Sequence, residues 1–182
     1  MTSRALAPAS PSARGAAVVG RLHDLRHVEL ASVMFLRLWC DGAAGQAKVR
    51  AEVVGLLGAA DGQAWLRRFE DLLIVATRRG RRPLVRRAAG CACLCGDEAL
   101  FATLVSTAAE LEREEAAMLA ALVVRADVAL PLAQLAADVG IGIKRMGLRV
   151  SRPVPADASE TAFVDAPASP DRRRPAPPRT LH

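Results

Sequence analysis

The spacing of apolar residues through the middle of the chain constrains its fold more than any other feature. Between residues 19 and 150, Ala, Leu and Val recur every three or four positions, which is the period of an amphipathic helix. Strand-like alternation is absent, and aromatic residues, which favour strands, make up only 3% of the chain. We therefore predict an all-α fold, a single compact bundle of five to six helices.

Glycines and capping residues divide this region into helices. The expected helices cover residues 22–40, 44–57, 61–79, 97–108, 112–123 and 127–149. The first is apolar on most faces in its second half, so we expect it to be the central helix. No Gly or Pro separates the fourth from the fifth, which leaves open whether they form one helix or two. Gly140 and Gly142 predict a break or bend in the last.

The two ends of the chain differ from the middle in composition. Residues 1–18 and 151–182 are rich in Pro and small polar residues, so we expect disordered arms on either side of a helical domain at 19–150. We identify the longest apolar stretch as 30–40, which is far shorter than the roughly 20 residues that span a bilayer. With no signal-peptide pattern, we expect a cytoplasmic protein that does not contact a membrane.

Cys91, Cys93 and Cys95 alternate in one short loop just before the fourth expected helix. Cytoplasmic thiols rarely form lasting disulfides, so these three are metal ligands, reactive thiols or buried small side chains. A site for zinc or iron would need a fourth ligand, for which Cys40 and His27 are the candidates. Zinc sites more often use cysteine pairs with two to four residues between them, whereas these have one, so this spacing is only moderately specific.

An arginine run precedes the cysteines. Positive charges, together with the start of a helix, can lower the thiol pKa of Cys95. The same arginines can also bind an anion or nucleic acid. A third possibility is that they lie in solvent without a binding role. The members of the run are Arg78, Arg79, Arg81, Arg82, Arg86 and Arg87.

Residues 131–149 resemble the helix-turn-helix motif of DNA-binding families. The resemblance rests on a small residue, a turn glycine and flanking apolar residues, here Ala136, Val139, Gly140, Ile141 and Met146. It implies that Lys144, Arg145 and Arg149 face the DNA groove or its phosphates. Gly142 and Gly147 depart from the pattern, because glycine weakens a recognition helix.

The sequence contains few residues suited to catalysis. It has three histidines, and it lacks both a Gly-rich phosphate loop and a nucleophile elbow. Whether the chain is an enzyme stays open, and a non-enzymatic protein is favoured. The leading hypothesis is a small helical interaction or regulatory protein with a metal- or redox-responsive cysteine loop and a protein partner. The alternative is a DNA-binding regulator that uses residues 131–149.

Overall fold

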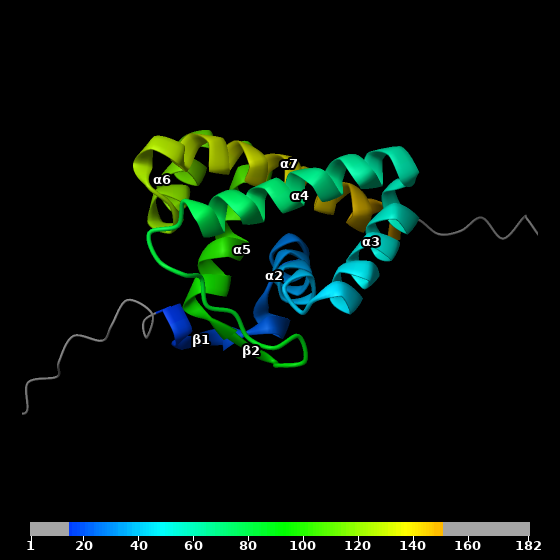
Figure 1. The fold of residues 1–182 in the computed structure, drawn as a ribbon, viewed down its shortest axis with the longest axis horizontal. Helices are drawn as coiled ribbons and strands as arrows, with labels where there is room; N and C mark the ends of the chain where they lie inside the picture. The colour runs from blue at the N-terminus through cyan, green and yellow to red at the C-terminus, as the bar shows by residue number, and fades with distance from the viewer. Residues whose placement is uncertain (1–14, 151–182) are drawn as a thin grey trace, which may run out of the picture. The chain divides into compact units, whose positions relative to one another are not determined.

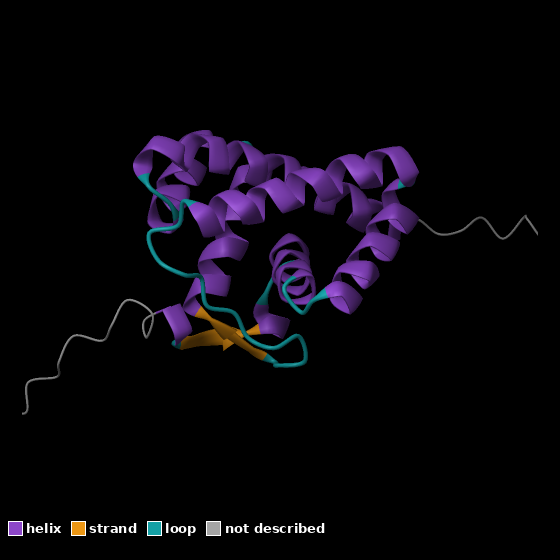
Figure 2. Cartoon of the chain, in the orientation of Figure 1, coloured by secondary structure: helices purple, strands orange, loops and turns teal. Residues whose placement is uncertain are grey.

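Six α-helices and one small sheet make up the part of the chain that the structure describes (Figures 1 and 2). The computed structural model describes residues 15–150, so the predicted arm residues 1–14 and 151–182 lie outside it. The prediction of an all-α bundle is confirmed. In chain order the elements are β1 (Val18–Arg21), a 3₁₀ turn (Leu22–Asp24), α2 (His27–Trp39), α3 (Ala43–Leu57), α4 (Ala59–Arg78), β2 (Cys93–Cys95), α5 (Gly96–Ala109), α6 (Arg113–Val123), a second 3₁₀ turn (Ala126–Val128) and α7 (Ala129–Val150).

Helix α2 lies among the other helices, as predicted for the first helix of the bundle. Figure 1 shows it nearly end-on, with α3, α4 and α5 around it. Phe35 on α2 meets Trp65 on α4 edge to face, with ring centroids 5.4 Å apart, and Trp39 meets Phe69 in the same way at 5.6 Å. Trp65 and Phe69 stack on each other at 5.0 Å. These aromatic contacts fasten α2 to α4 at the centre of the core.

Helix α7 runs without interruption from Ala129 to Val150, so the predicted break at Gly140 and Gly142 is wrong. Both glycines allow a neighbouring helix to approach closely. A Cβ on Gly140 would lie 2.6 Å from the carbonyl oxygen of Val105 on α5, and a Cβ on Gly142 would overlap the Trp65 ring. The Trp65 indole N–H donates to the carbonyl of Val139 at 2.9 Å, which fixes α4 against α7.

The continuous α7 also bears on the expectation that no apolar stretch is long enough to span a membrane. The segment Ala126–Val150 is long and apolar enough to cross a membrane when judged by length and composition alone. One side of this helix is buried against α4, α5 and α6. The buried residues on α7 include Leu132, Ala136, Val139 and Ile143.

Helices α5 and α6 are separate, which answers the question that the sequence left open. The chain turns between them at Leu111, whose φ of 66° is left-handed and ends α5. Because non-glycine residues seldom adopt this conformation, a leucine here is a poor signal of a turn.

The first helix begins later than predicted because the chain before it joins a sheet. Helix α2 starts at His27, and the first residues of the predicted helix form the 3₁₀ turn Leu22–Asp24 instead. Just before that turn, residues 18–21 form β1, which pairs antiparallel with β2. Val18 lies opposite Cys95 and Arg21 opposite Cys93. The carbonyl of Ala17 also accepts the N–H of Gly96 at 3.0 Å. Residues 15–18, which by composition resemble the arm, are therefore part of the folded body.

The close approach of α4 to α7 can be tested by adding one methyl group. We expect Gly142→Ala to lower the free energy of unfolding by about 1–3 kcal/mol, because its Cβ would collide with the Trp65 ring. Gly55→Ala is the matched control: its Cβ meets nothing within 4 Å, so it should raise stability by about 0.5–1 kcal/mol. Urea denaturation of both variants measures the difference. Equal stabilisation by the two changes would contradict the packing described.

Candidate functional site

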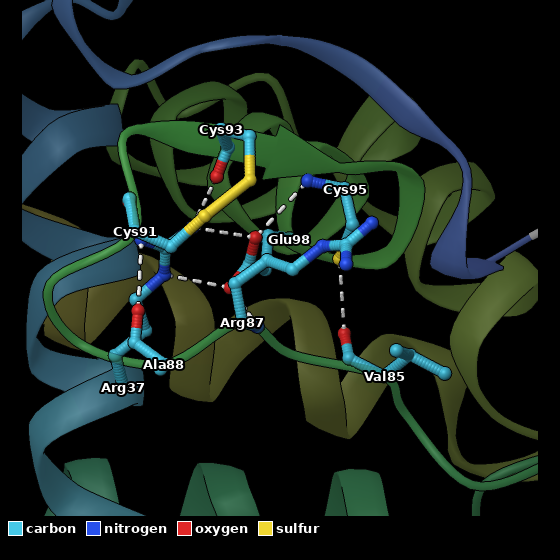
Figure 3. A network of polar contacts seen from close by, with 8 residues as sticks. All are labelled: Arg37, Val85, Arg87, Ala88, Cys91, Cys93, Cys95 and Glu98. Atoms are coloured by element: carbon cyan, nitrogen blue, oxygen red, sulfur yellow. Dashed lines mark hydrogen bonds and ion pairs between the residues drawn. A yellow bond between two sulfur atoms is a disulfide. The ribbon is translucent and has the colours of Figure 1, made fainter.

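The four cysteines differ in state and position, and Figure 3 shows the three of the loop, Cys91, Cys93 and Cys95. Cys91 and Cys93 form a disulfide, with their Cα atoms 5.5 Å apart. Cys95 is buried, and its thiol donates to the carbonyl of Val85 at 3.3 Å. Cys40 follows the end of α2 and is exposed. The expectation of reduced thiols throughout is therefore wrong for Cys91 and Cys93.

A buried arginine lies directly beneath the disulfide. Arg37 on α2 is fully buried and forms an ion pair with the equally buried Glu98 on α5. Its Nε donates to Oε1 of Glu98 at 2.7 Å, and its Nη2 donates to Oε2 at 2.8 Å. This two-pronged geometry is the strongest that an arginine makes with a carboxylate.

The remaining donors of Arg37 reach the backbone of the cysteine loop. Nη1 donates to the carbonyl of Cys91 at 2.6 Å and, less closely, to that of Ala88 at 3.4 Å. Nη2 donates to the carbonyl of Cys93 at 2.7 Å. With the two bonds to Glu98, these use all five N–H groups of the guanidinium. Both residues of the disulfide are thus held through their carbonyls by one buried charge.

Glu98 accepts backbone hydrogen bonds as well as those of Arg37. The N–H of Arg87 donates to Oε1 at 2.7 Å, and the N–H of Cys95 donates to Oε2 at 3.0 Å. The second bond is half of a capping box, in which Cys95 precedes α5 and Glu98 is its third residue. Burial alone would raise the pKa of Glu98, but the hydrogen bonds from Arg37, Arg87 and Cys95 outweigh it and lower the pKa.

A second buried carboxylate, Asp97, holds the other end of the same loop. Arg82 donates to it through both Nη atoms, with the Nη1–Oδ2 distance at 2.6 Å, and the Val85 N–H donates at 2.8 Å. Burial opposes ionisation, yet these hydrogen bonds keep the pKa of Asp97 below its usual value. We call residues 81–96 the cysteine strap, because the two carboxylates fasten this segment to the helices.

The arginine run serves largely to attach the strap. Beyond Arg82, the Arg81 Nε donates to the carbonyl of Val124 at 2.9 Å, and the Arg86 Nη2 donates to that of Cys40 at 2.6 Å. The Arg87 Nη2 donates to the carbonyl of Ala16 at 2.7 Å. These side chains therefore point to the protein's own backbone. Arg78 and Arg79, the other two members of the run, are exposed, and an anion or nucleic-acid contact of the run stays a prediction.

The two free thiols are not activated. Burial raises the pKa of Cys95, and the neighbouring Glu98 carboxylate adds to that increase, although backbone hydrogen bonds lower it in part. The expectation that arginines would lower this pKa is wrong, because those arginines bind Asp97 and carbonyl groups instead. Burial also raises the pKa of Cys40, against a smaller opposing effect of Arg86. Thiol chemistry in this loop therefore centres on Cys91 and Cys93.

The residues predicted to bind a metal are not brought together. Cys91 and Cys93 are joined to each other, and Cys95 faces Val85. Cys40 and His27 lie at opposite ends of α2. Within residues 15–150, no three His, Cys, Asp or Glu side chains are grouped to hold a metal ion. The hypothesis of a zinc or iron site therefore has no geometric support in this part of the chain.

The residues of the DNA-binding alternative lie on one unbroken helix. Residues 131–149 contain no turn, so the helix-turn-helix arrangement predicted for them is wrong. Lys144 pairs with Glu110 at 2.7 Å, and Arg145 pairs with Asp61 at 2.6 Å. Arg149 is exposed in the last turn of α7. DNA binding stays a prediction without the motif that suggested it.

Sequence reasoning missed Arg37 and Glu98, the two residues that organise the site. In the sequence, Arg37 looks like an interruption of an apolar stretch. A single arginine among apolar residues that point inward could have indicated a buried ion pair, because a buried charge needs a buried partner. The spacing of Cys95 and Glu98 is a second signal, since a carboxylate three residues after a helix start commonly completes a capping box.

Removing one member of the buried pair should be costly. We expect Glu98→Gln to lower the free energy of unfolding by about 3–5 kcal/mol, because Arg37 would keep its charge without a counter-charge. The double variant Arg37→Gln/Glu98→Gln should be more stable than Glu98→Gln alone. Asp61→Asn, which breaks the exposed pair with Arg145, should cost no more than about 1 kcal/mol. Urea denaturation measures all three, and similar losses for Glu98→Gln and Asp61→Asn would refute the special role of the pair.

The same carboxylates predict acid sensitivity. The pKa values of Asp97 and Glu98 are lower in the folded protein than in the unfolded chain, where they lie at about 3.9 and 4.3. The two ionised carboxylates therefore stabilise the fold fully at a pH above their pKa values in the unfolded chain. This stabilisation is lost as the pH falls through their lower pKa values in the folded protein. The slope of unfolding free energy against pH below about 4 should be smaller in Arg37→Gln/Glu98→Gln than in the wild type. Identical slopes would contradict this assignment.

Comparison with known proteins adds no functional information. No protein-family model, no curated protein sequence and no solved structure matches this chain. The function therefore has to be inferred from the geometry of the cysteine strap and the helices that hold it.

Proposed function

We propose that this protein is a thiol–disulfide-responsive helical regulator without enzymatic activity. The redox state of Cys91 and Cys93 controls how firmly the cysteine strap is held on the helices. One observation carries the proposal: Arg37, buried and paired with Glu98, donates hydrogen bonds to the carbonyls of both disulfide-bonded residues. A change in the covalent link between these residues therefore acts directly on a buried charge.

The chemistry is reversible exchange with a small thiol. A dithiol breaks the Cys91–Cys93 bond, leaves a thiol on each cysteine and becomes a disulfide itself. Glutathione disulfide reverses the reaction, releasing two molecules of glutathione. In the cytoplasm, where we expect this protein to be, thiols are kept reduced, so the disulfide would form only under oxidation.

Reduction weakens the hold of Arg37 on the strap. With the link broken, the backbone between Cys91 and Cys93 samples more conformations, and its two carbonyls are no longer fixed over the guanidinium. The other attachments, through Asp97 and the N–H groups of Arg87 and Cys95, remain. We therefore expect local opening of the strap and not global unfolding. A protein partner that binds the strap in one state would respond to oxidation.

Hydrogen exchange tests this proposal directly. In the reduced protein, amide exchange in residues 85–95 should be about tenfold faster than in the oxidised protein, while α4 and α7 change little. Cys91→Ser/Cys93→Ser should exchange like the reduced protein and ignore added dithiol. Cys40→Ser, which leaves the pair intact, should retain the full response.

Counting thiols provides the second measurement. Alkylation under denaturing conditions should label two cysteines in the oxidised protein and four in the reduced protein. The samples used for hydrogen exchange are checked in this way. If the sample with two free thiols and the sample with four free thiols show the same exchange rates in the strap, the proposal is overturned.

A further inference from the structure

The structure divides the arginine run of the sequence into two groups. The inner group is bonded to a buried carboxylate or to backbone carbonyls, through the contacts described above. The outer group lies at the end of α4, where it is joined by an arginine that follows the end of α6 (Figure 1). We call these four exposed residues the outer arginine cluster: Arg78, Arg79, Arg81 and Arg125.

Backbone pairing places two members of the cluster directly opposite each other. Gly80 and Val124 form an antiparallel bridge, and the N–H of Arg125 donates to the carbonyl of Arg79 at 3.3 Å. Arg79 and Arg125 are therefore cross-strand neighbours, whose side chains leave the pair on the same side. Like charges in this relation destabilise a strand pair, so the fold bears a cost here that a bound anion would remove.

The protein neutralises only part of this positive charge. Asp127 pairs with Arg125 at 3.3 Å, and within residues 15–150 it is the only carboxylate that pairs with any member of the cluster. Helices α4 and α6 both end here, and each helix end carries about half a negative charge. Asp127 and the two helix ends together offset about two of the four positive charges. The surplus, in a chain with a formal net charge of +6, attracts anions.

Several N–H groups of the cluster are available to a ligand. In the described part of the chain, the side chains of Arg78 and Arg79 make no hydrogen bond or ion pair. Arg81 donates through its Nε to the carbonyl of Val124 at 2.9 Å, which holds its guanidinium beside the bridge and leaves both Nη groups unused. Guanidinium groups with free N–H donors suit phosphate oxygens, to which they can donate two parallel hydrogen bonds.

The aromatic residues indicate which phosphate-bearing partner fits. Proteins that bind single-stranded nucleic acid stack the bases on exposed aromatic side chains. Within residues 15–150 every aromatic side chain is buried, so this surface offers nothing for a base to stack on. A duplex keeps its bases stacked inside and presents its phosphates outside, where arginines can reach them. The buried aromatic residues are Phe35, Trp39, Trp65, Phe69 and Phe101.

We propose that the outer arginine cluster binds the phosphate backbone of double-stranded nucleic acid without reading its sequence. This contact differs from the helix-turn-helix alternative, because it uses residues at the ends of α4 and α6 and none on α7. It goes beyond the redox proposal and does not rest on it. Arg81 is held by Val124 at the start of the cysteine strap, whereas the disulfide lies toward the strap's other end.

Fluorescence anisotropy of a labelled duplex of about 20 base pairs, titrated with the full chain at about 50 mM salt, tests the proposal. Arg79→Gln/Arg125→Gln should weaken binding by about tenfold or more. The slope of log affinity against log salt should also fall by about 2, because each lost phosphate contact removes about 0.9. Neither side chain bonds to a buried group, so urea denaturation of this variant should match the wild type.

Arg21→Gln/Arg67→Gln is the matched control. It removes the same charge from two exposed arginines outside the cluster, so it should weaken binding by less than about threefold. Any contribution from residues outside the described part of the chain is the same in every variant. A second duplex of unrelated sequence should bind with the same affinity, and a single strand of the same length should bind more weakly.

Four results would overturn the proposal. The wild type fails to bind the duplex at about 100 µM protein, even if it binds vesicles that contain phosphatidylserine. The two double variants lose the same affinity. The salt slope of Arg79→Gln/Arg125→Gln equals that of the wild type. The single strand binds more tightly than the duplex.

Discussion

Arg37 carries a positive charge inside the protein, and its need for partners determines how the segment above it folds. Removing such an ion from water costs several kcal/mol unless a counter-charge and further hydrogen bonds replace the solvent. Glu98 supplies the counter-charge, and the carbonyls of Ala88, Cys91 and Cys93 receive the remaining N–H groups. The conformation of the cysteine strap therefore depends on this buried ion pair as well as on the packing of its own buried residues Leu94 and Cys95.

The link between this charge and the disulfide is what makes the strap suited to a switch. A disulfide between cysteines two residues apart closes a very short loop. By itself it would restrict few backbone bonds beyond that loop. Here the same few residues supply two of the acceptors that satisfy a buried guanidinium. Under the proposed function, a local covalent change therefore alters the hydrogen bonding of a buried charge shared by α2 and α5.

Much of the fold could be predicted from the sequence, because helix formation depends on local periodicity. The apolar spacing identified the helical segments, and Gly58 marks the boundary between α3 and α4. The errors have a common cause, since they involve partners distant in the chain. Gly142 resembles a helix breaker until Trp65 is seen against it, and residues 18–21 form a strand only because β2 lies alongside. Neither contact is visible in a local window.

The position of the candidate site was easier to predict than its chemistry. The cysteine cluster itself drew attention to the correct segment, whereas Arg37 and Glu98 lie 61 residues apart and neither stands out alone. The geometry of the site depends on the hold that Arg37 has on the strap through the carbonyls of Cys91 and Cys93. Nuclear magnetic resonance of the Arg37 guanidinium tests it most directly, with Arg37→Lys used to assign the signals. We expect separately resolved, slowly exchanging Nη protons in the oxidised protein, and their signals should become averaged on reduction. Identical guanidinium spectra in the two states would contradict it.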